Sequence, residues 1–180
     1  MSTAASQPRF DVPRRMVLMG VAGSGKTTVG EALASAIGAD YVDGDRLHPP
    51  ANIEKMSAGI PLTDDDRWPW LAEVGRVLGE APTPLIVGCS ALKKAYRAFI
   101  AEQAGAPVLF IHLDGSRELI AGRMGQRTGH FMPSSLLDSQ FAALEPPGAD
   151  EFAITVGIDK PLAGIVDDIA AKLEKTSRQA

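Results

Sequence analysis

Short apolar runs alternate with longer segments in which apolar residues recur every three or four positions. The runs predict buried strands, and the helical spacing predicts helices with one buried face. The expected strands are 16–19, 39–42, 85–87, 108–113 and 152–156, and the expected helices are 26–37, 68–78, 93–103, 117–124 and 162–173. This alternation predicts an α/β fold with three layers, in which helices cover both faces of a mainly parallel five-stranded sheet.

The loop after the first predicted strand carries the strongest chemical signal. Its sequence GVAGSGKTT matches the spacing G-x-x-x-x-G-K-[ST] of a loop that binds nucleotide phosphates. Glycines let the backbone wrap a phosphate, and the following helix directs its positive end toward it. The residues assigned to ATP here are Gly20, Gly23, Ser24, Gly25, Lys26, Thr27 and Thr28. A chance glycine-rich turn is the competing interpretation, but a strand before the loop and a helix after it favour nucleotide binding.

Lys26, Thr27 and Thr28 have distinct expected roles within that loop. The Lys26 ammonium is expected to reach the β- and γ-phosphates and to take part in catalysis. The Thr27 hydroxyl is expected to ligate Mg²⁺, and Thr28 to contact the α-phosphate.

Composition narrows the class of protein further. The 180 residues carry a net charge of -4 with a pI near 5.4, which argues against a nucleic-acid binder. The single cysteine, Cys89, excludes an internal disulfide and a cysteine-cluster zinc site. No apolar run is long enough to span a membrane, and the first residues lack the apolar core of a secretory signal. We therefore expect a single cytoplasmic domain, flexible at residues 1–14 and at the C-terminal EKTSRQA.

Two segments interrupt the alternation. Residues 43–67, here called the insert, follow the second strand, and residues 123–133, here called the lid segment, separate two predicted helices. In a small kinase a substrate-binding insert and a mobile lid lie at such places.

The insert begins with DGDRLHPP. Asp43 and Asp45 end the second strand, and either is suited to Mg²⁺ or to the hydroxyl that attacks the phosphate. Each is also suited to a turn or a helix cap. His48 is either a packed residue or a substrate contact, and Asn52 is expected to cap a short helix. One of the three acids at 64–66 is expected to cap the helix that follows.

Basic residues gather at the strand ends and around the lid segment. Arg67 is suited to bind an anionic substrate, and the basic run of Lys93, Lys94 and Arg97 suggests an anionic acceptor, with a solvated surface as the alternative. Arg123 and Arg127 flank the lid segment, where they are suited to clamp phosphates.

These motifs together resemble the gluconokinases, small phosphate-loop kinases. The resemblance covers about residues 16–166 and rests on GVAGSGKTT, DGDRLHPPANIEKMSAGIPLTDDDRWPWL, CSALKKAYR, GHFMPSSLLDSQFAALEPP and ITVGIDKPL. It implies phosphorylation of D-gluconate at the C6 hydroxyl by ATP with Mg²⁺, giving 6-phospho-D-gluconate and ADP. It also implies a cytoplasmic homodimer that feeds the pentose phosphate and Entner–Doudoroff routes.

The resemblance also implies a set of site residues. Asp43 would serve the metal with Thr27, and Asp45 the C6 hydroxyl. The residues that would line the gluconate pocket are Asp45, His48, Arg67, Lys94, Arg97, His130 and Gln140. Arg123 and Arg127 would reach ATP, with Arg127 contributing to catalysis, and Asp159 and Pro161 would border the adenine. Gly157 departs from the family pattern, in which that position is often acidic.

Two other functions fit the motifs less well. One is a kinase for another small acid, similar to shikimate kinase. The other is a nucleotide-binding regulator that needs no acceptor, which the polar insert and the lid segment disfavour.

Overall fold

The computed structural model describes residues 10–126 and 134–179. Its sheet consists of β1 (Arg15–Met19), β2 (Asp40–Asp43), β3 (Leu85–Gly88), β4 (Leu109–Asp114) and β5 (Ala153–Gly157). The strands lie in the order β2-β3-β1-β4-β5, and every neighbouring pair is parallel. The five predicted strands are confirmed to within a residue at either end, and so is the α/β class.

Seven α-helices and one short 3₁₀ turn connect the strands in the described residues. They are α1 (Lys26–Ile37), η1 (Gly44–Leu47), α2 (Pro50–Ser57), α3 (Asp64–Glu80), α4 (Lys94–Ala104), α5 (Arg117–Gly125), α6 (Ser134–Ala143) and α7 (Leu162–Gln179). The prediction that the C-terminal segment frays is wrong for residues 174–179, because α7 continues through them. Its apolar face, including Ile169 and Leu173, is buried and accounts for the helix's stability.

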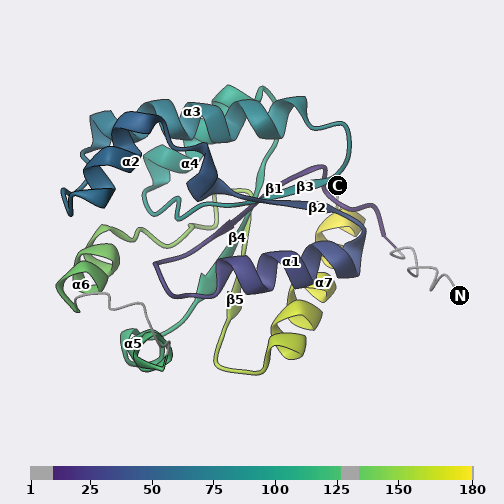
Figure 1. Ribbon diagram of the computed structural model, residues 1–180. Coiled ribbons are helices and arrows are strands. Elements are labelled where there is room, and N and C mark those ends of the chain that lie inside the picture. The colour runs from purple at the N-terminus through teal and green to yellow at the C-terminus, as the bar shows by residue number, and fades with distance from the viewer. Residues whose placement is uncertain (1–9, 127–133, 180) are drawn as a thin grey trace, which may run out of the picture.

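Alternation along β1 creates the three layers. Met16 and Leu18 point into a core shared with α1 and α7, and Val17 and Met19 point into a second core shared with α3 and α4. Figure 1 shows α1 and α7 on one face of the sheet and α3 and α4 on the other. Burial on both faces explains why β1 is apolar without interruption.

The start of α3 differs from its prediction. The helix begins at Asp64 rather than Trp68, and its cap is Thr63 rather than one of the aspartates. The Thr63 hydroxyl accepts the Asp66 N–H, and the Asp66 carboxylate accepts the Thr63 N–H in return. The three acids therefore lie in the first turn, where negative charge stabilises the positive end of a helix.

The N-terminal residues that the structure describes are attached to the domain. Phe10 and Val12 pack against the core on the α1 side, and Arg14 Nη2 donates to the Pro82 carbonyl at 2.9 Å. Residues 10–14 therefore contact the folded domain, and the expected flexibility of the N-terminal arm stays a prediction. Residues 1–9 lie outside the described residues.

Close packing of α3 on α4 depends on glycine. A Cβ at Gly75 would lie 2.7 Å from the Ile100 carbonyl oxygen, and one at Gly79 would lie 2.7 Å from the Ala104 carbonyl oxygen. Both oxygens belong to the backbone of α4, which has little freedom to withdraw.

We expect Gly75→Ala to lower the free energy of unfolding by about 1–3 kcal/mol, since the added methyl group overpacks the contact between two helices. Gly164→Ala in α7 is the matched control, because its Cβ first meets the flexible Lys160 side chain at 3.4 Å. That variant should be neutral or more stable by up to about 1 kcal/mol. Urea denaturation of both variants measures the difference, and equal stabilities would contradict the packing argument.

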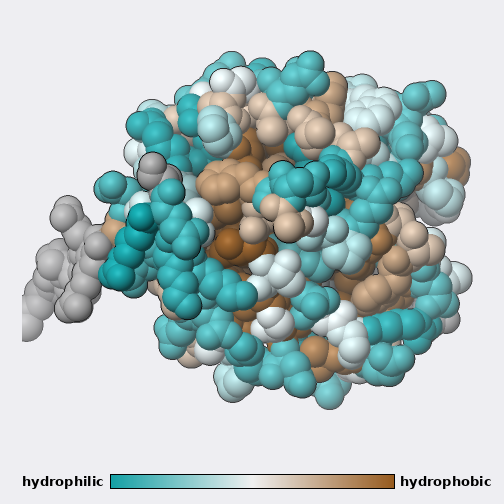
Figure 2. Space-filling model, turned by 180° about the vertical axis from the view of Figure 1, so that it is seen from behind, coloured by the Kyte–Doolittle hydropathy of each residue, from teal (hydrophilic) through white to brown (hydrophobic). Residues whose placement is uncertain are grey.

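The surface is mainly hydrophilic with small groups of exposed apolar residues, as Figure 2 shows for one face. The large apolar side chains that remain exposed are Ile53, Met56, Ile60, Leu136, Phe152 and Leu162. Among the described residues no helix is both long and apolar enough to cross a membrane.

Candidate active site

The candidate site lies at the carboxyl end of the sheet. β1 is the central strand and leads into the phosphate loop, residues 20–27, while the neighbouring β3 ends at Gly88 and β2 ends at Asp43. Figure 1 shows α1 starting from the loop that follows β1, beside the ends of the other strands. In open parallel sheets ligands bind at this edge, where the chain order reverses.

The phosphate loop has the backbone that its glycines predict. Gly20, Gly23 and Gly25 have φ values of 155°, 81° and 93°, which are conformations that other residues rarely adopt. A Cβ at Gly20 would also lie 2.7 Å from the Ser24 hydroxyl oxygen, and one at Gly23 would lie 2.7 Å from Met124. The loop therefore needs glycine for both its conformation and its space.

Polar groups in the loop remain available to an anion. Lys26 Nζ donates to the carbonyls of Gly20 at 2.9 Å and Val21 at 3.1 Å, so its ammonium is folded back over the loop. The Ser24 Oγ is buried and has no hydrogen-bond partner within the described part of the chain. The buried Ser24 hydroxyl and the Lys26 ammonium are therefore suited to bind phosphate oxygens.

Charge around Lys26 is balanced by two carboxylates. Burial lowers the pKa of the Lys26 ammonium, while Asp45 and then, after the Cys89 thiol, Asp43 act in the opposite direction. The start of the insert therefore contributes negative charge to the surroundings of Lys26. Thr27 and Thr28 are exposed in the first turn of α1.

Asp43 has the turn role that was one of its expected roles. Its Oδ1 accepts the Asp45 N–H at 3.0 Å and so caps η1, which is the turn interpretation. A carboxylate retains further lone pairs after one such bond, so Asp43 still suits a metal. Mg²⁺ is usually held by one or two carboxylates, waters and substrate phosphates, and Thr27 with Asp43 fits that pattern. No cluster of three or more metal-binding side chains occurs among residues 10–126 and 134–179.

Gly44, which the sequence analysis did not single out, places Asp43 and Asp45. A Cβ at Gly44 would lie 2.2 Å from the Gly88 carbonyl oxygen, so only glycine lets this segment approach the end of β3. The Gly44 carbonyl accepts Trp70 Nε1–H at 2.8 Å. In the sequence, the only indication of this role is that Gly44 stands between two acids. Its packing partners, Trp70 and Gly88, lie 26 and 44 residues away.

His48 lies within the insert and packs against α3. Its ring stacks on Trp70 with the ring centroids 4.0 Å apart, and the residue is 8% exposed. Asn52 is buried within α2, where its Nδ2 contacts His48 Nδ1 at 3.2 Å and the Asp66 carbonyl at 2.8 Å. The prediction that Asn52 caps this helix is wrong, because the cap position is Pro49.

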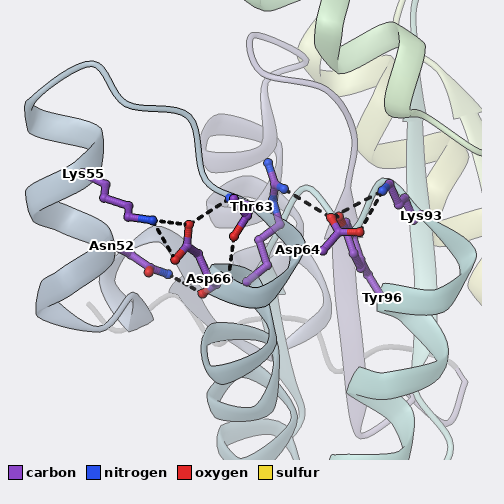
Figure 3. A network of polar contacts seen from close by, with 8 residues as sticks. Asn52, Lys55, Thr63, Asp64, Asp66, Lys93 and Tyr96 are labelled. Atoms are coloured by element: carbon purple, nitrogen blue, oxygen red, sulfur yellow. Dashed lines mark hydrogen bonds and ion pairs between the residues drawn. The ribbon is translucent and has the colours of Figure 1, made fainter.

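A polar network joins the insert to α3 and α4 (Figure 3). Lys55 pairs with Asp66 at 2.8 Å, and this bond together with the Thr63 bond holds the pKa of Asp66 at about 2. The Asp64 carboxylate accepts from the Tyr96 hydroxyl and from Lys93 Nζ at 3.1 Å, and these bonds lower its pKa.

Arg67 and Lys93 meet at the Asp64 carboxylate. Arg67 Nη1 lies 3.4 Å from Asp64 Oδ1, which is a long and only partly buried ion pair. Such a pair contributes little and exchanges readily, so both cations can turn to an anionic ligand. Arg67 was predicted as an anion contact, whereas Lys93 appeared only as part of a basic run.

Arg97 departs from the expectation that it lines a substrate pocket. Its side chain is 1% exposed and pairs with Glu151 at 2.7 Å. Its Nη1 also donates to the carbonyls of Ala91 and Leu92. The Arg97 guanidinium is buried and already hydrogen-bonded, so it is not accessible to a ligand. Its role is structural, since it links α4 to the segment before β5. Lys94 is exposed and pairs with Asp150 at 2.5 Å.

We expect Arg97→Ala to lower the free energy of unfolding by about 3–5 kcal/mol, because it leaves Glu151 without its buried partner. Lys94→Ala, at the neighbouring exposed pair, should change stability little. Arg97 lowers the pKa of Glu151, so the wild-type pair contributes stability above the ordinary glutamate pKa that is lost as the pH falls through the lowered value. Denaturant unfolding between pH 3 and 7 should show that acid-dependent loss in the wild type and less of it in Arg97→Ala. Equal stability of the two alanine variants would contradict this assignment.

Of the other predicted site residues, Gln140 contacts the phosphate loop and Arg123 contacts the segment of the expected adenine edge. Arg123 Nη2 donates to the Ile158 carbonyl at 2.6 Å, next to the exposed Asp159 and Pro161 of the expected adenine edge. Gln140 Oε1 accepts the Ala22 N–H of the phosphate loop at 3.0 Å, so α6 touches the loop directly. Arg127 and His130 lie outside the described residues.

Comparison with known proteins places these features in a family. A family model described as "AAA domain" matches residues 16–147. A gluconokinase of Gluconobacter oxydans is 50% identical over 151 residues, covering 82% of this chain and 84% of the relative. A probable gluconokinase of Xenopus tropicalis is 41% identical over 177 residues, covering 89% and 93%.

Solved structures agree with the sequence relatives. A crystal structure of a gluconokinase from Sinorhizobium meliloti superposes with a TM-score of 0.86 at 50% identity, covering 93% of this chain and 95% of that one. A shikimate kinase from Aquifex aeolicus has a TM-score of 0.58 at 18% identity, covering 92% and 99%. That second likeness shows a shared fold and nothing further.

Proposed function

The chain belongs to the gluconokinase family and phosphorylates gluconate at the expense of ATP, and from this premise we propose how its residues divide the reaction. The γ-phosphoryl group would pass to the C6 hydroxyl, giving 6-phospho-D-gluconate and ADP. The observation that carries the proposal is a glycine-dependent phosphate loop after β1, with Lys26 Nζ folded over its carbonyls and the buried Ser24 hydroxyl unpaired within the described residues.

The phosphate loop would bind ATP through its backbone N–H groups and the start of α1. Lys26 would leave the carbonyls of Gly20 and Val21 and turn to the β- and γ-phosphates, where charge develops during transfer. Ser24, Thr28 and Arg123 would support phosphate binding. Arg127 is proposed from the resemblance alone, and so is the adenine contact of Asp159 and Pro161.

Thr27 and Asp43 would hold Mg²⁺, which when bound neutralises charge on the β- and γ-phosphates. Asp43 is suited to this role because its Asp45 contact fixes the carboxylate at the end of β2. Removal of divalent metal with a chelator should stop turnover, and added Mg²⁺ should restore it.

Asp45 would receive the acceptor. Its side chain is exposed, and its negative charge opposes the lowering of the Lys26 pKa by burial, which supports a hydroxyl held by Asp45 that faces the phosphate loop. Asp45 would orient the hydroxyl and stabilise its developing charge.

Gluconate is an anionic polyol, so its site needs cations and hydroxyl partners. Arg67 with Lys93 would take the carboxylate, since the two cations already converge on a carboxylate in Asp64. His48 would contact a hydroxyl. Lys94, His130 and Gln140 are proposed from the resemblance, and Arg97 is left out because it is sealed from solvent.

An ADP-release assay with a panel of acids tests the acceptor. We expect turnover with D-gluconate and little with shikimate or other sugar acids. Turnover with another acid and none with gluconate would overturn the assignment, and ATP loss without any acceptor would favour the regulator. The cytoplasmic location and the homodimer stay proposals, the second of which light scattering of the purified protein tests.

A further inference from the structure

The buried amide of Asn52 has an unambiguous orientation. Its Nδ2 lies 2.8 Å from the Asp66 carbonyl oxygen, as Figure 3 shows, and a carbonyl oxygen accepts hydrogen bonds but never donates them. The reversed amide would place two oxygens against each other at that distance. The nitrogen of Asn52 must therefore face Asp66, whichever way an amide is first assigned.

The same amide nitrogen decides the tautomer of His48. A primary amide has two hydrogens, and with one on Asp66 the other points to His48 Nδ1 at 3.2 Å. Nδ1 must then accept this hydrogen bond, because a proton on Nδ1 would clash with the Asn52 hydrogen. A neutral imidazole whose Nδ1 accepts carries its proton on Nε2.

The rest of the His48 environment supports this state. Burial lowers the pKa of the His48 imidazole; the Asp45 carboxylate opposes that shift and the Arg67 guanidinium adds to it. The stack on Trp70 holds the plane of the ring. Within the described part of the chain Nε2 has no hydrogen-bond partner, and it is not among the polar atoms sealed from solvent.

We propose that Asn52 is a positioning residue that holds His48 as the Nε2–H tautomer, so that His48 presents a fixed hydrogen-bond donor to an acceptor oxygen of gluconate. The choice of gluconate rests on the proposed function, whereas the tautomer rests on the Asn52 geometry alone. An Nε2 that already carries a proton has no lone pair to take another. His48 therefore recognises the acceptor substrate and leaves the attacking hydroxyl to Asp45.

The tautomer is measured on the wild-type protein without any activity. The chain has three histidines, so a long-range ¹H–¹⁵N spectrum contains three imidazole patterns, and His48→Gln identifies which belongs to His48. We expect Nδ1 to resonate as an unprotonated nitrogen and Nε2 as a protonated one near pH 7.5. The opposite pattern would overturn the proposal, and it would do so even if gluconate were the correct substrate.

A double-mutant cycle tests the link to substrate. Asn52→Leu should raise the KM for gluconate about tenfold, the loss of one hydrogen bond of about 1.4 kcal/mol, with the KM for ATP little changed. In a His48→Ala background the same substitution should add no further increase. An equal increase in both backgrounds would mean that Asn52 acts only through the stability of the insert.

Two conservative variants of His48 separate its two nitrogens. Glutamine can place an N–H donor near the position of Nε2, whereas asparagine reaches only the position of Nδ1. We expect His48→Gln to keep the KM for gluconate within about threefold of the wild type and His48→Asn to raise it about tenfold. A better substrate affinity in His48→Asn would contradict the donor role of Nε2.

Discussion

Replacing Lys26 by methionine is expected to lower kcat for gluconate phosphorylation by about 10³-fold, the size of effect seen when a group that stabilises transition-state charge is removed. The Lys26 ammonium contacts only carbonyls of its own loop among the described residues, which is consistent with the role proposed for it at the phosphates. Methionine keeps the unbranched side chain and the helix propensity of α1.

The fold of Lys26→Met should be retained, which a thermal unfolding curve close to that of the wild type would show. Lys175→Met is the control, because Lys175 is an exposed lysine near the C-terminal end of α7 and is not among the proposed site residues, and its kcat should match the wild type. Normal turnover in Lys26→Met would remove the phosphate-loop assignment. Loss of activity together with loss of folded protein would leave the assignment to be tested in the milder variant Lys26→Arg, which should retain the charge but misplace it and lower kcat at least tenfold.

Asp45→Asn is expected to lower kcat about 10²-fold while changing the KM for ATP by no more than about threefold. The substitution keeps the size of the side chain and the backbone N–H that Asp43 accepts, so the turn should persist. What it removes is the negative charge that would hold the acceptor hydroxyl opposite Lys26.

Asp65→Asn is the matched control for that experiment. Asp65 is an exposed acid in the first turn of α3, and it has no side-chain partner within the described residues. We expect wild-type kinetics from it. A large increase in the KM for ATP with kcat preserved in Asp45→Asn would instead place Asp45 on the nucleotide side of the site.

The order of strands and helices was readable from the sequence because each element carries its own local signal. Buried parallel strands are apolar throughout, whereas in helices with one buried face the apolar residues recur every three or four positions. The phosphate loop was readable for a related reason, since its positive φ angles restrict positions 20, 23 and 25 to glycine. In each case the physical requirement is met by residues that are neighbours in sequence.

The helix caps in the insert were harder to predict from the sequence. Aspartate is a common cap, and so the acids at 64–66 suggested a cap where Thr63 with Asp66 forms one. Asn52 invited the same interpretation, although its amide is used to join His48 to α3. The sequence shows which residues are able to cap a helix. Which of them does so depends on the tertiary contacts that the other candidates make.

By itself the sequence determined the layered α/β fold, the ATP-binding loop and the family to which the chain belongs, because these depend on local backbone conformation and on motifs of contiguous residues. Only the tertiary structure decided which polar residues are free for chemistry. Arg97 and Lys94 lie three residues apart, yet a glutamate 54 positions away seals one of them in the interior while the other stays exposed. Burial and pairing are set by such distant contacts, and no spacing along the chain contains them.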